Sequence, residues 1–153
     1  RPKSSAASDV YKRQVGGSLR QLNRLKEIAK EMLNTDFDKK ITELEIDLNA
    51  LEITELRMLS ALENGGQVGP ESSILKIRGT EIQQRLTELF VEASGEHALL
   101  YPGPHGFGSN DKPSGPDYSA DAVSKFLNMR KTSIYGGSNE IQKNIISKFV
   151  LGV

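Results

Sequence analysis

Hydrophobic residues recur every three or four positions along most of the chain, which is the spacing of one face of an α-helix. The pattern predicts helices over residues 17–33, 37–62, 70–94, 119–131 and 138–152. No run alternates apolar and polar residues in the way that a half-buried strand does. The expected fold is therefore all-α: a four-helix up-and-down bundle, with a short C-terminal helix packed across it or against a partner.

The segment over residues 37–62 is the longest of these and carries apolar residues on two sides. One stripe consists of Ile41, Leu44, Leu48, Leu51, Met58 and Leu62, and a second consists of Ile46, Ala50, Ile53 and Leu56. A helix that is apolar on two sides packs against more than one neighbour, so this helix is expected at the centre of the bundle. In the last helix, the residues expected to face inward are Ile141, Ile145, Ile146 and Phe149.

The same long segment is rich in carboxylates. They are Glu43, Glu45, Asp47, Glu52 and Glu55. Paired carboxylates can serve acid–base chemistry or bind a metal, but no histidine lies nearby to complete a metal-binding motif on the helix. These residues are therefore expected to form a solvated face.

The ends of the predicted helices carry cap and stop residues. Thr35 or Asp36 is expected to cap the helix over residues 37–62. Gly95 is expected to stop the preceding helix, because glycine readily adopts the left-handed conformation that ends many helices.

Residues 96–117 hold four prolines and four glycines, which is too many for a regular element. A loop of this length in a compact domain is usually functional or disordered. Both histidines, His97 and His105, lie in it or at its edge. Metal binding would need further ligands at suitable spacing and the chain has no cysteine, so both are expected to be ordinary polar residues.

Length, charge and hydropathy narrow the class of protein. The chain has 153 residues, which favours one domain, and 20 basic residues balance 20 acidic ones. Balanced charge gives no electrostatic reason to expect nucleic acid or an anionic membrane as a partner. No apolar run approaches the roughly 20 residues that span a bilayer, and the N-terminus lacks the apolar core of a signal peptide. A cytoplasmic protein without a membrane span is expected.

Residues 1–14 differ from the rest of the chain because they show no sustained apolar period. They are expected to be disordered or to form a frayed helix start. The segment resembles translated sequencing linker, so it is interpreted as non-native and left out of the fold prediction. The expected domain therefore covers residues 15–153, as a fragment of a longer protein.

A glycine-bearing turn near the C-terminus is the strongest candidate for chemistry. Gly136 and Gly137 allow positive φ and a close approach of the backbone to a neighbour. Ser138 is expected to cap the helix that follows, with Asn139 and Glu140 in its first turn. Free N–H groups and the helix dipole favour electron-rich partners there, so a flat polar ligand could dock at this helix start. An ordinary turn with a cap is the alternative.

The whole string from Thr132 to Gly152 closely resembles the C-terminal signature of the acyl-CoA dehydrogenases, which are flavin enzymes. The resemblance implies the C-terminal four-helix bundle of that family, without its N-terminal helical domain and its middle β domain. The sequences of residues 43–48 and 77–84 resemble those of bacterial members of the pimeloyl-CoA dehydrogenase large-subunit type, which pair with a smaller homologous subunit. A homo- or heterotetramer is implied.

The resemblance also implies roles for residues of the turn. Tyr135 and Gly136 would line the acyl-CoA site, and Ser138, Asn139 and Glu140 would contact the FAD. Gly95 would lie near the flavin pyrophosphate of a neighbouring subunit. The family's glutamine just before that glycine corresponds to Glu92, and its Arg-x-x-Phe-Gly flavin motif has no match at residues 34–38.

No catalytic residue can be named in this chain. In the family, a glutamate removes the α-proton of the acyl-CoA while a hydride leaves the β-carbon for the flavin, so a carboxylate must lie within hydrogen-bond reach. Many members place this glutamate directly after the tyrosine, where the chain has Gly136. Other members place it in the first bundle helix, at a position in or before residues 1–14.

Three functions are therefore considered. The first is the C-terminal fragment of a flavin-dependent acyl-CoA dehydrogenase that passes electrons to an electron-transferring flavoprotein. The second is a non-catalytic partner subunit of a heteromeric enzyme, suggested by Gly136. The third is a stand-alone helical interaction module, because an amphipathic bundle needs no cofactor to exist.

Overall fold

The computed structural model describes residues 3–67, 69–100 and 115–152, and it describes side chains from residue 15 onward. The α-helices are α1 Lys3–Met32, α2 Thr35–Glu63, α3 Glu71–Ser94, α5 Ala122–Met129 and α6 Asn139–Ile146. Shorter helical turns are η1 Gly95–Leu99, η2 Asp117–Ser119, η3 Arg130–Ser133 and the π-helical turn η4 Ser147–Leu151. The described residues contain no strand, so the all-α prediction is confirmed.

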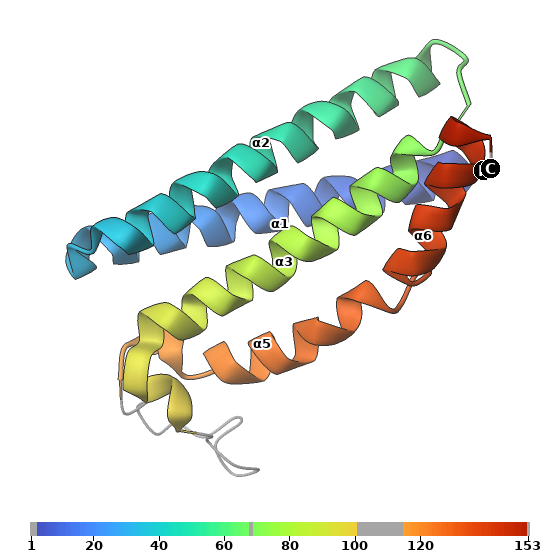
Figure 1. Cartoon of the computed structure of the whole chain (residues 1–153). Coiled ribbons are helices and arrows are strands. Elements are labelled where there is room, and N and C mark those ends of the chain that lie inside the picture. Colours follow the sequence, from blue (N-terminus) through green and yellow to red (C-terminus); the bar gives the residue numbers. More distant parts are fainter. Residues whose placement is uncertain (1–2, 68, 101–114, 153) are drawn as a thin grey trace.

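Successive long helices run in opposite directions, and α5 lies along α3 as the fourth, shorter member of the bundle (Figure 1). The last helix, α6, packs against the first half of α3. The loop expected over residues 96–117 is replaced at its two ends by η1 and η2. His105 and the other residues from 101 to 114 lie outside the described part of the chain.

Helix α1 begins at Lys3, well before the predicted start at residue 17. Of the two expectations for residues 1–14, disorder or the start of a helix, the structure has a helix over residues 3–14, which continue α1. An apolar stripe is needed for packing, but a helix also extends through local hydrogen bonds wherever good helix formers such as Ala6 and Ala7 follow one another. The interpretation of residues 1–14 as non-native stays a prediction.

The start of α2 shows how one residue can displace an expected cap. The Oδ1 atom of Asn34 accepts hydrogen bonds from the backbone N–H of Asp36 at 3.0 Å and of Phe37 at 3.2 Å. Asn34 is thus the N-cap, and the expected caps Thr35 and Asp36 lie inside the first turn. Asparagine ranks among the best N-cap residues, so a cap by Asn34 is ordinary chemistry for a helix start.

The centre of the bundle is α3, because it packs against α1, α2, α5 and α6. The helix over residues 37–62 was expected at this place, which is wrong: α2 packs against α1 and α3, with Phe37 and its first apolar stripe in or against the core. The fully buried residues include Leu22 and Leu25 of α1, Phe37 and Leu48 of α2, and Leu86 and Leu89 of α3.

The second apolar stripe of α2 faces outward in the described structure. Ile46 is 63% exposed, and Ile53 and Leu56 are each 58% exposed. The apolar pattern thus counted two faces correctly, but only one of them has a neighbour among the described residues. We call Ile46, Ile53 and Leu56 the outer stripe of α2.

The carboxylates of α2 do not all lie on a solvated face. Glu55 is only 4% exposed, so its expected place among the solvated residues is wrong. The others sit at the surface or the margin of the bundle, where some pair with cations. Glu45 pairs with Lys26 of α1 at 2.5 Å.

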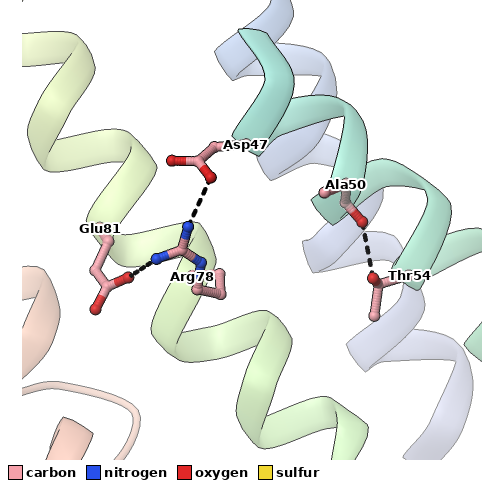
Figure 2. A network of polar contacts seen from close by, with 5 residues as sticks. All are labelled: Asp47, Ala50, Thr54, Arg78 and Glu81. Carbon is pink, nitrogen blue, oxygen red and sulfur yellow. Dashed lines mark hydrogen bonds and ion pairs between the residues drawn. The ribbon is translucent and has the colours of Figure 1, made fainter. Parts of the chain in front are cut away.

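An arginine of α3 joins α2 to α3 at the surface (Figure 2). The Arg78 guanidinium donates to Asp47 of α2 and to Glu81 of α3, both at 2.7 Å. Each of these side chains is nearly half exposed, so the ion pairs are expected to stabilise the packing by about 0.2–1 kcal/mol each. The pair with Asp47 connects α3 to α2, whereas the pair with Glu81 lies within α3, and apolar contacts supply most of the stability of the packing.

The last helix is shallower than its pattern predicted. Ile141 is 54% exposed and Phe149 is 72% exposed, so the expectation that both face inward is wrong. Ile145 and Ile146 are half-buried. A helix of eight residues that rests on one neighbour can bury only a narrow stripe, and the π-helical turn η4 changes the direction of the side chains that follow it.

No helix in the described part of the chain is both long and apolar enough to cross a membrane.

Candidate functional site

The glycine turn before α6 has the backbone that the sequence predicted. Gly136 has φ +70° and Gly137 has φ +90°, values that residues with a Cβ rarely adopt. The side chain of Gln142 returns from α6 and donates from Nε2 to the Gly136 carbonyl at 3.1 Å. A Cβ added to Gly137 would lie 2.5 Å from this Nε2 atom, whereas one added to Gly136 would meet no atom within 4 Å. Gly136 therefore leaves open space at its position in the turn.

The predicted cap is confirmed. Ser138 is the N-cap of α6, and its Oγ accepts from the backbone N–H of Ile141 at 3.4 Å. The Ser138 carbonyl accepts from the N–H of Gln142 at 3.0 Å, which is the first hydrogen bond of the helix. The N–H groups of Asn139 and Glu140 precede that bond, so they are directed out of the helix start.

Two side chains of α3 hold this segment to the bundle. Lys76 donates from Nζ to the Ser133 carbonyl at 3.2 Å and to the Asn139 Oδ1 atom at 2.8 Å. Two turns further along α3, Gln84 lies within 3.3 Å of oxygen atoms in and next to η3. These are the carbonyls of Met129 and Arg130 and the hydroxyl of Thr132, which is 1% exposed. Side chains of α3 therefore hold η3 and the glycine turn in position.

Hydrogen bonds at the helix start favour an ionised Glu140, whereas burial disfavours a charged Lys76. Burial lowers the pKa of Lys76, and the nearby Glu140 partly opposes this. Hydrogen bonds from its own backbone N–H and from Ser138 lower the pKa of Glu140, with smaller contributions from Lys143 and Lys76. The helix start thus carries the exposed carboxyl group of Glu140 next to the half-buried amino group of Lys76.

The structure brings five of the six expected site residues together and leaves one apart. Tyr135, Gly136, Ser138, Asn139 and Glu140 share the turn, with Tyr135 54% exposed. Gly95 ends α3 with φ +53° and donates its N–H to the Glu92 carbonyl, as expected of a stop residue. It lies 19 residues beyond Lys76, which is about 28 Å along the axis at a rise of 1.5 Å per residue. One chain cannot place Gly95 and the turn against the same small group.

Sequence reasoning missed Lys76, Gln84 and Gln142. A signal for Lys76 existed, since it interrupts the apolar run from Ile74 to Ile77 at a position that α3 half-buries. Gln84 and Gln142 gave no comparable signal, because polar residues on a helix surface are the ordinary case.

The described bundle also contains a cavity that lies away from the glycine turn. A cavity of about 440 Å³ opens between α1, α3 and α5, with Arg24, Phe90 and Lys125 among its lining residues. Lys125 is paired with Asp121 at 2.6 Å. None of the expected site residues lines it. The described residues also contain no group of three histidine, cysteine, aspartate or glutamate side chains placed to hold a metal ion.

Comparison with known proteins identifies the family. A family model described as "Acyl-CoA dehydrogenase, C-terminal domain" matches residues 21–151. The chain belongs to this family. The match includes α2, α3, α5 and α6 with the glycine turn, so the acyl-CoA dehydrogenase C-terminal domain accounts for almost the whole described bundle. A search of curated proteins found no match.

Several solved structures share the fold of this acyl-CoA dehydrogenase domain. One is the "Tcur3481-Tcur3483 steroid ACAD", with a TM-score of 0.71 and 16% identity over 91% of this chain. Another is "PigA with FAD and proline", with a TM-score of 0.70 and 20% identity over 96% of this chain. A third is the ChsE4-ChsE5 complex from Mycobacterium tuberculosis, with a TM-score of 0.64 and 19% identity over 92% of this chain.

The chain spans only about a third of the length of these structures, namely 35%, 36% and 35% of the respective chains. At such identities the likeness shows the fold alone. The activity and partners of a whole acyl-CoA dehydrogenase are therefore matters for proposal.

Proposed function

We propose that the chain is the C-terminal bundle of a flavin-dependent acyl-CoA dehydrogenase, which oxidises an acyl-CoA thioester to the enoyl-CoA. The observation that carries the proposal is the family match over residues 21–151, which includes the glycine turn and the capped start of α6. The PigA structure, similar in fold, is named as holding FAD.

The residues at the turn fit the edge of a flavin. Ser138 offers a hydroxyl, the first residues of α6 offer outward N–H groups, and the side-chain NH₂ of Asn139 can donate because its Oδ1 accepts from Lys76. The carboxylate of Glu140 accepts a hydrogen bond from its own backbone N–H. A ligand atom that accepts from this N–H would therefore share it with the carboxylate. When bound, the flavin would supply the hydride acceptor. The chain's own part is to orient it and to line the acyl-CoA site with Tyr135.

The distance between Gly95 and the turn supports an assembly of at least two subunits. If Gly95 lies near a flavin pyrophosphate, that flavin belongs to a different subunit from the one whose turn covers the ring. The outer stripe of α2 supports assembly as well, since three large apolar side chains on one helix face are the kind of surface that protein interfaces cover. A homo- or heterotetramer is proposed, with an electron-transferring flavoprotein as the acceptor of electrons.

Gly136 favours a second candidate function. Its position is open and carries no carboxylate, so residue 136 cannot remove the α-proton of a substrate. The chain would then be the flavin-binding, non-catalytic subunit of a heteromeric enzyme. The stand-alone interaction module accounts for neither the capped turn nor the family match.

The test is made on the full-length protein that contains this bundle. Flavin absorbance of the purified protein measures binding, and its bleaching by acyl-CoA without oxygen measures the reaction. Asn139→Ala is expected to weaken FAD binding about tenfold through the loss of one hydrogen bond, whereas Ser60→Ala on the exposed side of α2 is the matched control.

Three outcomes separate the candidates. Bound flavin that acyl-CoA bleaches supports the dehydrogenase. Bound flavin that bleaches only when a homologous subunit is added supports the non-catalytic partner. A protein that purifies without flavin and gains none from added FAD refutes both.

A further inference from the structure

Lys76 occupies a position that the packing of α3 would suit to an apolar residue. It lies between Leu75, which is 2% exposed, and Ile77, which is 8% exposed, and is itself half-buried. No carboxylate forms an ion pair with it within the described residues; its hydrogen bonds go to two neutral oxygens. Their residues, Ser133 and Asn139, follow it by 57 and 63 positions. The ammonium therefore joins distant parts of the chain.

The two acceptors lie on either side of the glycine turn. Ser133 ends η3, and Asn139 begins α6. The residues between them include Ile134 and Tyr135, which are 68% and 54% exposed and rest on no core. One ammonium thus ties both ends of an exposed turn to the same point of α3.

The bond to Asn139 also sets which end of its amide is presented. An asparagine side chain has an acceptor oxygen and a donor NH₂ group. Because Oδ1 accepts from Lys76 at 2.8 Å, the NH₂ group is the end left for a ligand. The helix start therefore offers a donor from Asn139, in addition to its outward backbone N–H groups.

Stability alone gives little reason for a lysine at this position. Burial lowers the pKa of Lys76, which shows that the folded protein disfavours its charge. An apolar side chain at position 76 would avoid this cost of burial, but it would lose the hydrogen bonds to the turn.

We propose that Lys76 is a positioning residue: it fixes the glycine turn on α3 and orients Asn139 so that its NH₂ group faces the flavin. This inference rests on the proposed function. Lys76 itself does not touch the flavin; it acts through Asn139 and the backbone of Ser133.

The first measurement is hydrogen exchange on the full-length protein that contains this bundle, comparing the wild type with Lys76→Met. The amides of Ile134 and Gln142, which are hydrogen-bonded within the turn and the start of α6, are expected to exchange about tenfold faster in the variant because a hydrogen bond to a charged group is lost. Amides of α1 and α2 are expected to keep their rates. Arg85→Met, which removes an exposed positive charge from the same helix, is the matched control and is expected to change neither set.

The second measurement is the dissociation constant for FAD in the full-length protein. Lys76→Met is expected to raise it about tenfold, and Lys76→Arg, which keeps donors, is expected to recover part of the loss. Asn139→Asp separates the two effects. It keeps an acceptor for Lys76, so exchange in the turn is expected to stay slow, but it removes the NH₂ donor and is expected to weaken FAD binding.

The outcomes distinguish this inference from the proposed function. Unchanged exchange in Lys76→Met overturns the positioning role, whether or not the protein binds FAD. Faster exchange with an unchanged dissociation constant for FAD also overturns it, because Lys76 would then order the turn without affecting FAD binding. Faster exchange in a protein whose wild type binds no FAD refutes the proposed function and leaves Lys76 as the residue that orders the turn. If Lys76→Met does not fold, Asn139→Asp with unchanged exchange and unchanged FAD affinity overturns the orientation of the amide.

Discussion

The replacement of Gly137 by alanine tests the geometry of the glycine turn directly. The new Cβ would lie 2.5 Å from the Nε2 atom of Gln142, so this flexible side chain has to move away. Its hydrogen bond to the Gly136 carbonyl, 3.1 Å long, is then lost. The same replacement at Gly136 meets no atom within 4 Å and leaves that hydrogen bond in place.

The two replacements share one cost and differ in another. Both glycines have positive φ, and holding a residue with a Cβ there costs about 1–2 kcal/mol. Gly137→Ala also loses a solvent-exposed hydrogen bond, which contributes about 0.5–1 kcal/mol. The free energy of opening the α6 start is therefore expected to fall by about 1–2 kcal/mol in Gly136→Ala and by about 1.5–3 kcal/mol in Gly137→Ala.

Native-state hydrogen exchange of the amides of α6 reports this opening free energy locally. The excess cost is isolated by repeating both replacements in a Gln142→Ala background, where the side chain that would clash is absent. The coupling between positions 137 and 142 is expected to be about 0.5–1 kcal/mol, and that between 136 and 142 is expected to be near zero.

Equal coupling at the two glycines would refute the reasoning, because it would mean that Gln142 does not lie over Gly137. A Gly136→Ala variant with no loss of protection would refute the shared backbone cost, since it would show that position 136 does not hold a positive φ.

Three further predictions concern the bundle and its charges. Leu86→Ala removes a fully buried side chain of α3 and is expected to lower the free energy of unfolding in urea by about 2–5 kcal/mol, whereas Leu127→Ala, 60% exposed, is expected to stay within about 0.5 kcal/mol; similar losses would contradict the placement of the core. Asn34→Ala is expected to cost about 1 kcal/mol in the same assay and Asn34→Asp much less, because only the first removes the cap of α2; equal losses would argue against it. The lowered pKa of Glu140 stabilises the folded state above pH 4.5, and this contribution is lost as the pH falls through the folded-state value. The melting-temperature difference between the wild type and Glu140→Gln is therefore expected to shrink on acidification, and a constant difference would contradict the shift.

Local signals predicted the parts of the structure that local chemistry determines. The helix period gave the all-α fold and the order of the helices, and the Gly136-Gly137-Ser138 string gave the positive φ values and the cap of α6. Each of these depends on neighbours a few residues away, which a single sequence displays.

Apart from the cap of α2 at Asn34 and the start of α1, the errors concern contacts between residues far apart in the sequence. The outer stripe of α2 has the same period as a buried stripe, and periodicity cannot say which stripe finds a neighbour. Lys76 and Gln84 reach the turn and η3 only because α3 is the centre of the bundle, and no spacing in the sequence shows that. The distance between Gly95 and the turn was likewise hidden, since it depends on α3 being straight and uninterrupted.

The central place of α3 has a consequence for how the sequence can change over evolutionary time. A helix with four neighbours has interfaces on several sides, so substitutions at its buried positions disturb at least one of them. The small residues Ser73, Gly79 and Thr80 are buried there, and larger residues at these positions are expected to disturb the packing. Related sequences should therefore vary least at the buried positions of α3 and more freely along its exposed stripe, which includes Arg78, Glu81 and Arg85. The outer stripe of α2 should drift to polar residues in lineages where nothing covers it and stay apolar where a partner does.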